Sequence, residues 1–165
     1  MKPSMKHRLT TFCAALLMLS APAFAQQPAF TLPQLKALAG LTPDAFREQI
    51  RSQGFSYADK TVTDEVSMIE YEKSVDGQTT HLMKSTYVES RRSEDGVQLS
   101  LTDKAAFERL VKEARDAGYT PGEKGRIPGG ETYQEYKRKN EVVRFVYPKK
   151  ASGMGLPSYT AVVWR

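Results

Sequence analysis

The sequence predicts an α+β fold built from two tandem units, each a helix followed by antiparallel strands, with the helices packed on one face of the sheet. Two amphipathic segments with recognisable ends, residues 42–54 and 103–118, predict the helices. Each is followed by two strand-like runs around a short turn and then by a loop and a further strand. Helices followed by runs of strands are typical of the α+β class.

The first twenty-five residues read as an export signal. Lys2, Lys6 and Arg8 precede an apolar run at 12–19, and the small residues of "APAFA" favour cleavage after Ala25. The run is too short to span a bilayer, which takes roughly 20 apolar residues. We therefore expect a signal peptide at 1–25, a periplasmic or secreted mature protein, and no transmembrane span after cleavage.

Cysteine content and charge limit the classes of protein to which the sequence can belong. The single cysteine, Cys13, lies inside the signal, so the mature chain has no disulfides and must be held together by its core. The formal net charge of +5 falls to +2 once the three basic residues of the signal are set aside, which argues against a nucleic-acid partner. Residues 121–165 nevertheless hold nine basic and four acidic side chains.

The first unit begins with two helices. Leu32, Leu35 and Leu38 share one side of a short helix over 32–39. In "LTPDAFREQIRSQGF", Thr42 is a good N-cap and Pro43 suits the first helical position, while Gly54 suits a left-handed stop that lets the next residue fold back.

The second unit begins with "LTDKAAFERLVKEARDAGY", where Asp103 is the expected cap. Its apolar side chains recur at helical spacing, and the Gly-aromatic stop is repeated at Gly118. We also expect an ion pair between Glu108 and Lys112 on the exposed side. The apolar stripe is formed by Phe107, Leu110, Val111 and Ala114.

The strands follow in the same order in both units. Asp76-Gly77 is a strong hairpin signal and Lys139-Asn140 a weaker one. "EYEK" at 70–73 aligns with "EYKR" at 135–138, and each unit closes with a loop and another strand. We interpret the pattern as a duplication, with units at 26–100 and 101–165 that either remain distinct or form one compact domain over 26–165.

This layout is similar to the tandem helix-and-sheet repeats of the secreted β-lactamase inhibitor proteins, which bind their target enzyme with the concave face of the sheet. The resemblance implies a protein-binding sheet face. In that family disulfides cross-link the repeats, whereas the mature chain of this protein has no cysteine. A single cone-shaped α+β fold of the nuclear-transport-factor type is the alternative architecture.

Few residues offer catalytic or metal chemistry. His81 is the only histidine after the signal, and no nucleophile-elbow pattern accompanies it. One histidine without cysteine also argues against a zinc site. Glu70 and Glu72 share one face of a strand and could act as an acid–base pair, but alternating acids are more typical of a solvated face. We therefore expect no catalytic residues, metal or cofactor.

The basic, aromatic C-terminal unit is the candidate binding region. Strand alternation places Tyr133 with Lys137 on one face and Tyr136 on the other, so one set is core and one is surface, and alternation does not say which. Tyr and Arg are enriched in protein interfaces. The candidate binding residues are Tyr133, Tyr136, Lys137, Arg144, Tyr147, Lys149 and Lys150.

Three functional hypotheses follow. The first is a non-catalytic binding or inhibitory module of the cell envelope that contacts an envelope or secreted protein through a sheet face and the loops at 125–130 and 149–158. The second is an envelope accessory protein that binds an anionic glycan or lipid through its basic side. The third is an enzyme that uses dispersed carboxylates.

Overall fold

The described part of the chain folds into three α-helices and eight strands. The computed structural model describes residues 30–149 and 157–165, and the segment 1–25, expected to be a signal peptide, lies outside them. The helices are α1 (Leu32–Gly40), α2 (Pro43–Ser52) and α3 (Lys104–Asp116), with a 3₁₀ segment η1 (Glu89–Glu94). The strands are β1 (Ser56–Val62), β2 (Val66–Val75), β3 (Gln78–Tyr87), β4 (Gly96–Leu101), β5 (Thr120–Arg126), β6 (Thr132–Arg138), β7 (Glu141–Tyr147) and β8 (Tyr159–Trp164).

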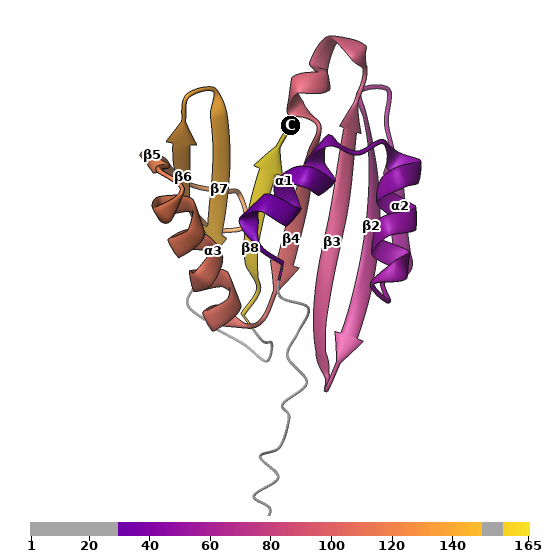
Figure 1. The fold of residues 1–165 in the computed structure, drawn as a ribbon, viewed down its shortest axis with the longest axis horizontal. Coiled ribbons are helices and arrows are strands. Elements are labelled where there is room, and N and C mark those ends of the chain that lie inside the picture. The colour runs from indigo at the N-terminus through magenta and orange to yellow at the C-terminus, as the bar shows by residue number, and fades with distance from the viewer. Residues whose placement is uncertain (1–29, 150–156) are drawn as a thin grey trace, which may run out of the picture.

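All eight strands form one antiparallel sheet in the order β1-β2-β3-β4-β8-β7-β6-β5 (Figure 1). The first four strands fill one half of the sheet and the last four fill the other. The two halves meet where β4 pairs with β8, with Leu99 opposite Ala161. The α+β class is therefore confirmed, and the strands of the two halves do not interleave as they would in the cone-shaped alternative. Duplication of the units stays a prediction.

The helices end where local sequence signals place them. Thr42 caps α2, and Asp103 accepts hydrogen bonds from the first turn of α3. Gly54 and Gly118 have φ of 85° and 83°, the left-handed conformation that glycine adopts without a steric cost. The amide that follows each glycine reaches back to the last helical turn, at 3.1 Å for Phe55 and 3.0 Å for Tyr119.

One expected ion pair is wrong. Glu108 pairs with Lys104 at 3.2 Å and Lys112 pairs with Asp116 at 2.5 Å, so the two residues do not pair with each other. Each has an alternative partner four residues away on the same exposed side of α3, and a surface pair of this kind contributes only a few tenths of a kcal/mol, about 0.3–0.5.

Both expected hairpins form. Val75 lies opposite Gln78 across Asp76-Gly77, and both turn residues have positive φ. Arg138 lies opposite Glu141 across Lys139-Asn140, and Lys139 has a φ of 53°. These turns set the register that decides which side chains share a face.

All three helices lie on one face of the sheet (Figure 1). The apolar side chains beneath them form one continuous core that spans both halves. Buried Lys84 donates to the Ala39 carbonyl at 2.5 Å and so ties the last turn of α1 to β3. No helix among the described residues is long and apolar enough to cross a membrane.

A candidate binding face on the uncovered side of the sheet

The alternation of side chains along the strands divides the sheet into a helix-covered face and a face that no described helix covers. Tyr71, Leu82 and Phe145 mark the covered face, where each is buried. We call the other side the open face. It carries Met68, Glu70, Glu72, His81, Met83, Ser85, Gln98, Ser100, Thr160, Val162, Trp164, Val142, Arg144, Val146, Tyr133, Glu135 and Lys137.

The register aligns these side chains in rows across the sheet. The middle row runs across six strands, from the acidic Glu70 on β2 to the Arg144–Glu135 pair on β7 and β6. Between these ends lie Met83, Gln98 and Val162. The open face therefore has an acidic end and a cation–aromatic end, separated by uncharged side chains.

Arg144 is the centre of the cation–aromatic end. Its guanidinium carbon lies 4.4 Å from the centroid of the Tyr133 ring and 5.3 Å from that of Trp164, and both are cation–π distances. Its Nη2 donates to Glu135 at 2.7 Å, and its Nε donates to the same oxygen at 3.3 Å. Three strands thus hold one guanidinium in a single orientation.

Glu135 is the buried anchor of this cluster. Its side chain is only 7% exposed, and its second oxygen lies 3.1 Å from Lys137 Nζ. Burial acts to raise the pKa of Glu135, but the hydrogen bonds from Arg144 and Lys137 outweigh it, so the pKa is lowered and the carboxylate stays ionised.

Two glycines make room for the aromatic rings. A Cβ at Gly125 would lie 2.6 Å from the Tyr133 ring, and the Tyr133 hydroxyl donates to Glu123 at 2.5 Å. Gly96 lies opposite Trp164, where a Cβ would lie 3.3 Å from the indole and 2.7 Å from the Val163 carbonyl oxygen. Each ring therefore packs against the backbone of a glycine on the neighbouring strand.

A groove of about 420 Å³ runs beside this cluster. Carboxylates and cations line it together with the Trp164 indole and Val142, so it offers charged and apolar contacts at once. Its charged side chains are Glu94, Glu123, Glu135, Lys137, Arg144 and Arg165.

The acidic end carries a different pair. The Nδ1 atom of His81 on β3 lies 2.7 Å from Glu70 Oε1 on β2, and both side chains are partly exposed. Ser100, the cross-strand neighbour of His81 on β4, instead shares a hydrogen bond of 3.0 Å with Thr160. Glu72 lies on the same face, as the alternation of β2 predicts.

The structure brings together three of the seven candidate binding residues. Tyr133, Lys137 and Arg144 lie side by side on β6 and β7 of the open face. Lys149 is exposed just beyond β7, with its Cδ 3.7 Å from the position a Cβ would take on Gly130. Lys150 lies outside the described residues.

Tyr136 and Tyr147 lie apart from these three residues, on the other face of the sheet. They lie on the helix-covered face, where Tyr136 is only 2% exposed and Tyr147 packs edge-on against Phe107 of α3, with centroids 5.2 Å apart. The Tyr136 hydroxyl accepts from Arg115 of α3 at 2.7 Å. Tyr136 belongs to the core and Tyr147 packs against it, because α3 covers their side of the sheet.

Glu135 and Gly96 take part in the cluster without having been predicted from the sequence. The two-residue alternation of side chains places Glu135 on the same face as Tyr133. Its burial, however, depends on Arg144, which lies on the neighbouring strand β7. Gly96 is far from Trp164 in sequence and becomes its neighbour through the β4–β8 pairing.

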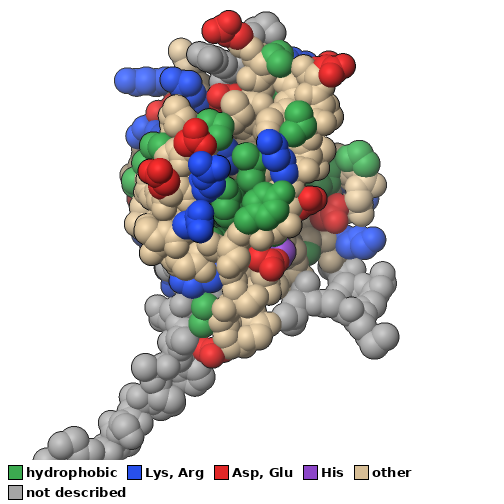
Figure 2. Space-filling model, turned by 90° about the vertical axis from the view of Figure 1, so that its right-hand side faces the viewer, with side chains coloured by type: hydrophobic (Ala, Val, Ile, Leu, Met, Phe, Trp, Pro, Cys, Tyr) green, Lys and Arg blue, Asp and Glu red, His purple; other side chains and the backbone are tan. Residues whose placement is uncertain are grey.

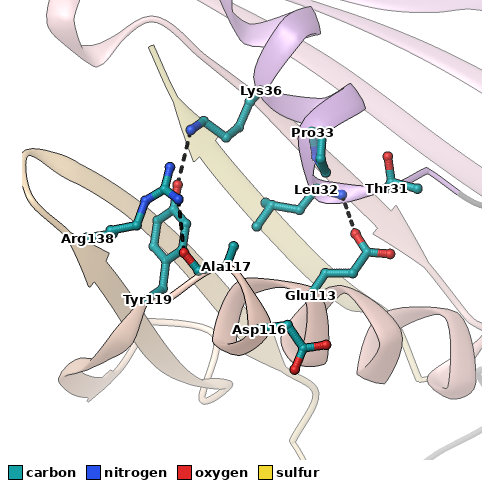
Figure 3. A pocket seen from close by; sticks show the side chains of 9 residues that line it. All are labelled: Thr31, Leu32, Pro33, Lys36, Glu113, Asp116, Ala117, Tyr119 and Arg138. Carbon is teal, nitrogen blue, oxygen red and sulfur yellow. Dashed lines mark hydrogen bonds between the residues drawn. The ribbon is translucent and has the colours of Figure 1, made fainter.

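A second hollow, of about 660 Å³, lies between α1, α3 and the β5–β6 side of the sheet (Figure 3). The Leu32 amide donates to Glu113 at 2.7 Å, and the Arg138 guanidinium donates to the Ala117 carbonyl at 2.9 Å. Lys36 donates to the Tyr119 hydroxyl at 3.2 Å. These polar groups are already used to join the elements, which favours a structural role.

Glu141 completes the network beside this hollow. It accepts hydrogen bonds from Lys36 at 2.6 Å, from the Tyr119 hydroxyl, and from Arg138 at 2.9 Å. These bonds, the one from Lys36 foremost, lower the pKa of Glu141 to about 2.

Neither a metal site in the described residues nor a known relative indicates the function of the chain. Within residues 30–149 and 157–165, no group of three or more histidine, cysteine or acidic side chains is placed to hold a metal ion. No protein family, curated protein or solved structure matches the chain significantly.

Proposed function

We propose that the chain is a non-catalytic binding or inhibitory module of the cell envelope that docks on a protein through the open face. The observation that carries this proposal is the Arg144 guanidinium, held between Tyr133 and Trp164 by the buried Glu135. An arginine and two aromatic rings held in place before binding lose little side-chain entropy when a partner docks.

The composition of the open face supports a protein partner. Aromatic residues, methionine and arginine are enriched in protein interfaces and supply most of their binding energy. The open face combines Trp164, Tyr133 and Arg144 with two methionines, and these side chains are partly exposed. A partner surface with basic groups opposite Glu70 and apolar groups opposite the Tyr133 and Trp164 rings would fit its two ends.

Binding of an anionic glycan or lipid is the alternative, and the ion pairs weaken it. Lys137 and Arg144 share Glu135, and Arg138 pairs with Glu141. A polyanion would have to compete with these internal carboxylates for the same cations, whereas a protein can contact the cluster as it stands.

An enzyme that uses dispersed carboxylates is the third candidate. The pairing of Glu70 with His81 is the feature that favours it. Replacement of both Glu70 and Glu72 by glutamine removes the acid end of the face. Any hydrolytic activity that the wild-type protein has and this double variant lacks would support an enzyme over a binding module.

The envelope location rests on the signal expected at 1–25, and the resemblance to β-lactamase inhibitor proteins stays an expectation based on element order. Together with the sheet, three helices and uncovered face, these features favour a target protein in the same compartment.

Chemical cross-linking in cells that express the full chain tests the proposal. A stoichiometric protein partner should co-purify with the wild type and with Arg109→Ala, an exposed change on α3, and its yield should fall about tenfold with Val162→Lys at the centre of the open face. Loss with Arg109→Ala and retention with Val162→Lys would contradict the proposal. Salt-sensitive retention on envelope polymer, strengthened by the added lysine, would favour the anionic-ligand alternative.

A further inference from the structure

The sheet ends in two free edges of different character. Among the described residues, β1 pairs only with β2 and β5 only with β6, so each edge strand has one side with backbone groups that no described strand uses. Free edges can add a strand from another chain, and proteins usually block them.

The β5 edge is blocked. Pro121 has no N–H, Gly122 and Gly125 weaken the strand, and the register with β6 shifts between Pro121 and Lys124. Proline, glycine and bulges are the devices that prevent edge pairing.

The β1 edge is open by comparison. It contains neither proline nor glycine, and after one irregularity near Tyr57 it pairs without interruption from Asp59 to Val62. Thr63 donates to the Val66 carbonyl at the β1–β2 turn, so alternation directs the backbone groups of Lys60 and Val62 away from β2. The Lys60 amide donates to Asp59 Oδ1 at 2.7 Å, so the Lys60 carbonyl and both backbone groups of Val62 are the positions that remain for strand addition in the described part of the edge.

Apolar surface accompanies this edge. Tyr57 and Val62 are 60% and 63% exposed, the highest values among the large hydrophobic side chains of the described residues. On the side of the molecule that carries α2 and the β1 edge, hydrophobic side chains gather among basic and acidic ones (Figure 2). Such a patch on an edge strand is typical of an interaction site.

Two arginines of α2 stand over the same edge. Arg47 and Arg51 line a groove of about 610 Å³ together with Tyr57 of β1, above the buried Phe55 and Tyr71. Arg47 has only the exposed Asp44 as an ion-pair partner, and Arg51 pairs with no acidic residue of the described parts of the chain. A carboxylate on an added strand would therefore meet the Arg51 charge, beside an Arg47 that is paired only with the exposed Asp44.

We propose that the β1 edge binds an extended, acidic segment of a partner protein as an additional antiparallel or parallel strand. Backbone bonds to Lys60 and Val62 would align the segment, alternate apolar side chains would cover Tyr57 and Val62, and an acidic side chain would face Arg47 and Arg51. A second copy of this chain fits less well, because its own Arg47 and Arg51 would add like charge to the shared sheet. This proposal stands independently of docking through the open face.

Selection of a random dodecapeptide library against the full chain tests the proposal. We expect the selected peptides to alternate apolar and acidic residues. Val62→Pro removes an edge N–H without touching the β1–β2 bonds and should weaken their binding about tenfold, whereas Val62→Thr keeps the N–H and should retain it. Arg47→Glu with Arg51→Glu should weaken the acidic peptides by a similar factor.

Two controls accompany the test. Far-UV circular dichroism checks that each variant is folded, and Val162→Lys on the open face should leave peptide binding unchanged. Selected peptides without acidic residues, or equal binding to wild type and Val62→Pro, would overturn the proposal. A dimer of the wild type that becomes a monomer with Val62→Pro in light scattering would overturn it in favour of a second copy.

Discussion

The contact between Gly96 and Trp164 illustrates how single residues build the open face. A methyl group at Gly96 would lie 2.7 Å from the Val163 carbonyl oxygen, which belongs to rigid backbone at the β4–β8 seam. The seam must therefore shift if any side chain is added there. Trp164 is the only tryptophan of the chain, so its fluorescence reports on this position.

Gly96→Ala should lower the free energy of unfolding by about 1–3 kcal/mol, the usual cost of overpacking, and change the tryptophan emission. Urea unfolding followed by fluorescence measures both effects. Gly40→Ala is the matched control, because no described atom beyond its chain neighbours and its own helix backbone lies within 4 Å of the added methyl group. An equal loss of stability in the two variants would contradict the steric explanation.

Glu141 is a residue whose charge contributes to stability. Because its pKa is about 2 in the folded protein and near 4.5 without its partners, the contribution is present above pH 4.5 and is lost as the pH falls toward 2. Glu141→Gln should therefore be less stable than wild type at pH 7, with a difference that shrinks between pH 4.5 and pH 2. Urea unfolding across this range measures it, and a difference independent of pH would contradict the role of the carboxylate.

At the scale of elements, helix ends follow from local sequence because their hydrogen bonds join residues only a few positions apart. Asp103 accepts from the Ala105 and Ala106 amides at 2.8 and 3.1 Å and so satisfies two donors that α3 cannot. The same locality explains why the glycine stops of α2 and α3 could be located from the sequence.

Asp103→Ala should destabilise the protein by about 1 kcal/mol, since the two amides lose their acceptor. Asp103→Asn preserves an oxygen at the same place and should cost much less. Thermal unfolding of both variants compares them. If Asp103→Asn lost as much stability as Asp103→Ala, the cap hydrogen bonds would not be the cause of the loss.

The assignment of strand faces could be made only in part at this scale. The two-residue period separates Tyr133 from Tyr136, but both faces of β6 carry one tyrosine and one basic residue. The side on which α3 packs decides the outcome, and it buries Tyr136 beneath Arg115. Burial of a strand residue is a tertiary property that its immediate neighbours do not encode.

At the scale of the whole molecule, the two halves share one core. α1 contacts both β4 and β8, and the buried apolar cluster continues across the seam between them. We therefore expect one cooperative unfolding transition. Trp164 fluorescence reports on the seam and far-UV circular dichroism on all helices and strands, so their urea midpoints should coincide. Separate midpoints would show that the halves unfold independently.

The sequence by itself determined the α+β class, the helix ends and both hairpin turns, because short-range periodicity and capping encode these features. It also indicated Tyr133, Lys137 and Arg144 as candidate binding residues. Tertiary structure decided that the halves join through β4 and β8, that Glu135 is the buried anchor, and which face stays open. It also decided that the β1 edge lies beneath the arginines of α2. Each of these depends on strands and helices distant in sequence, and such long-range pairings leave no local pattern to read.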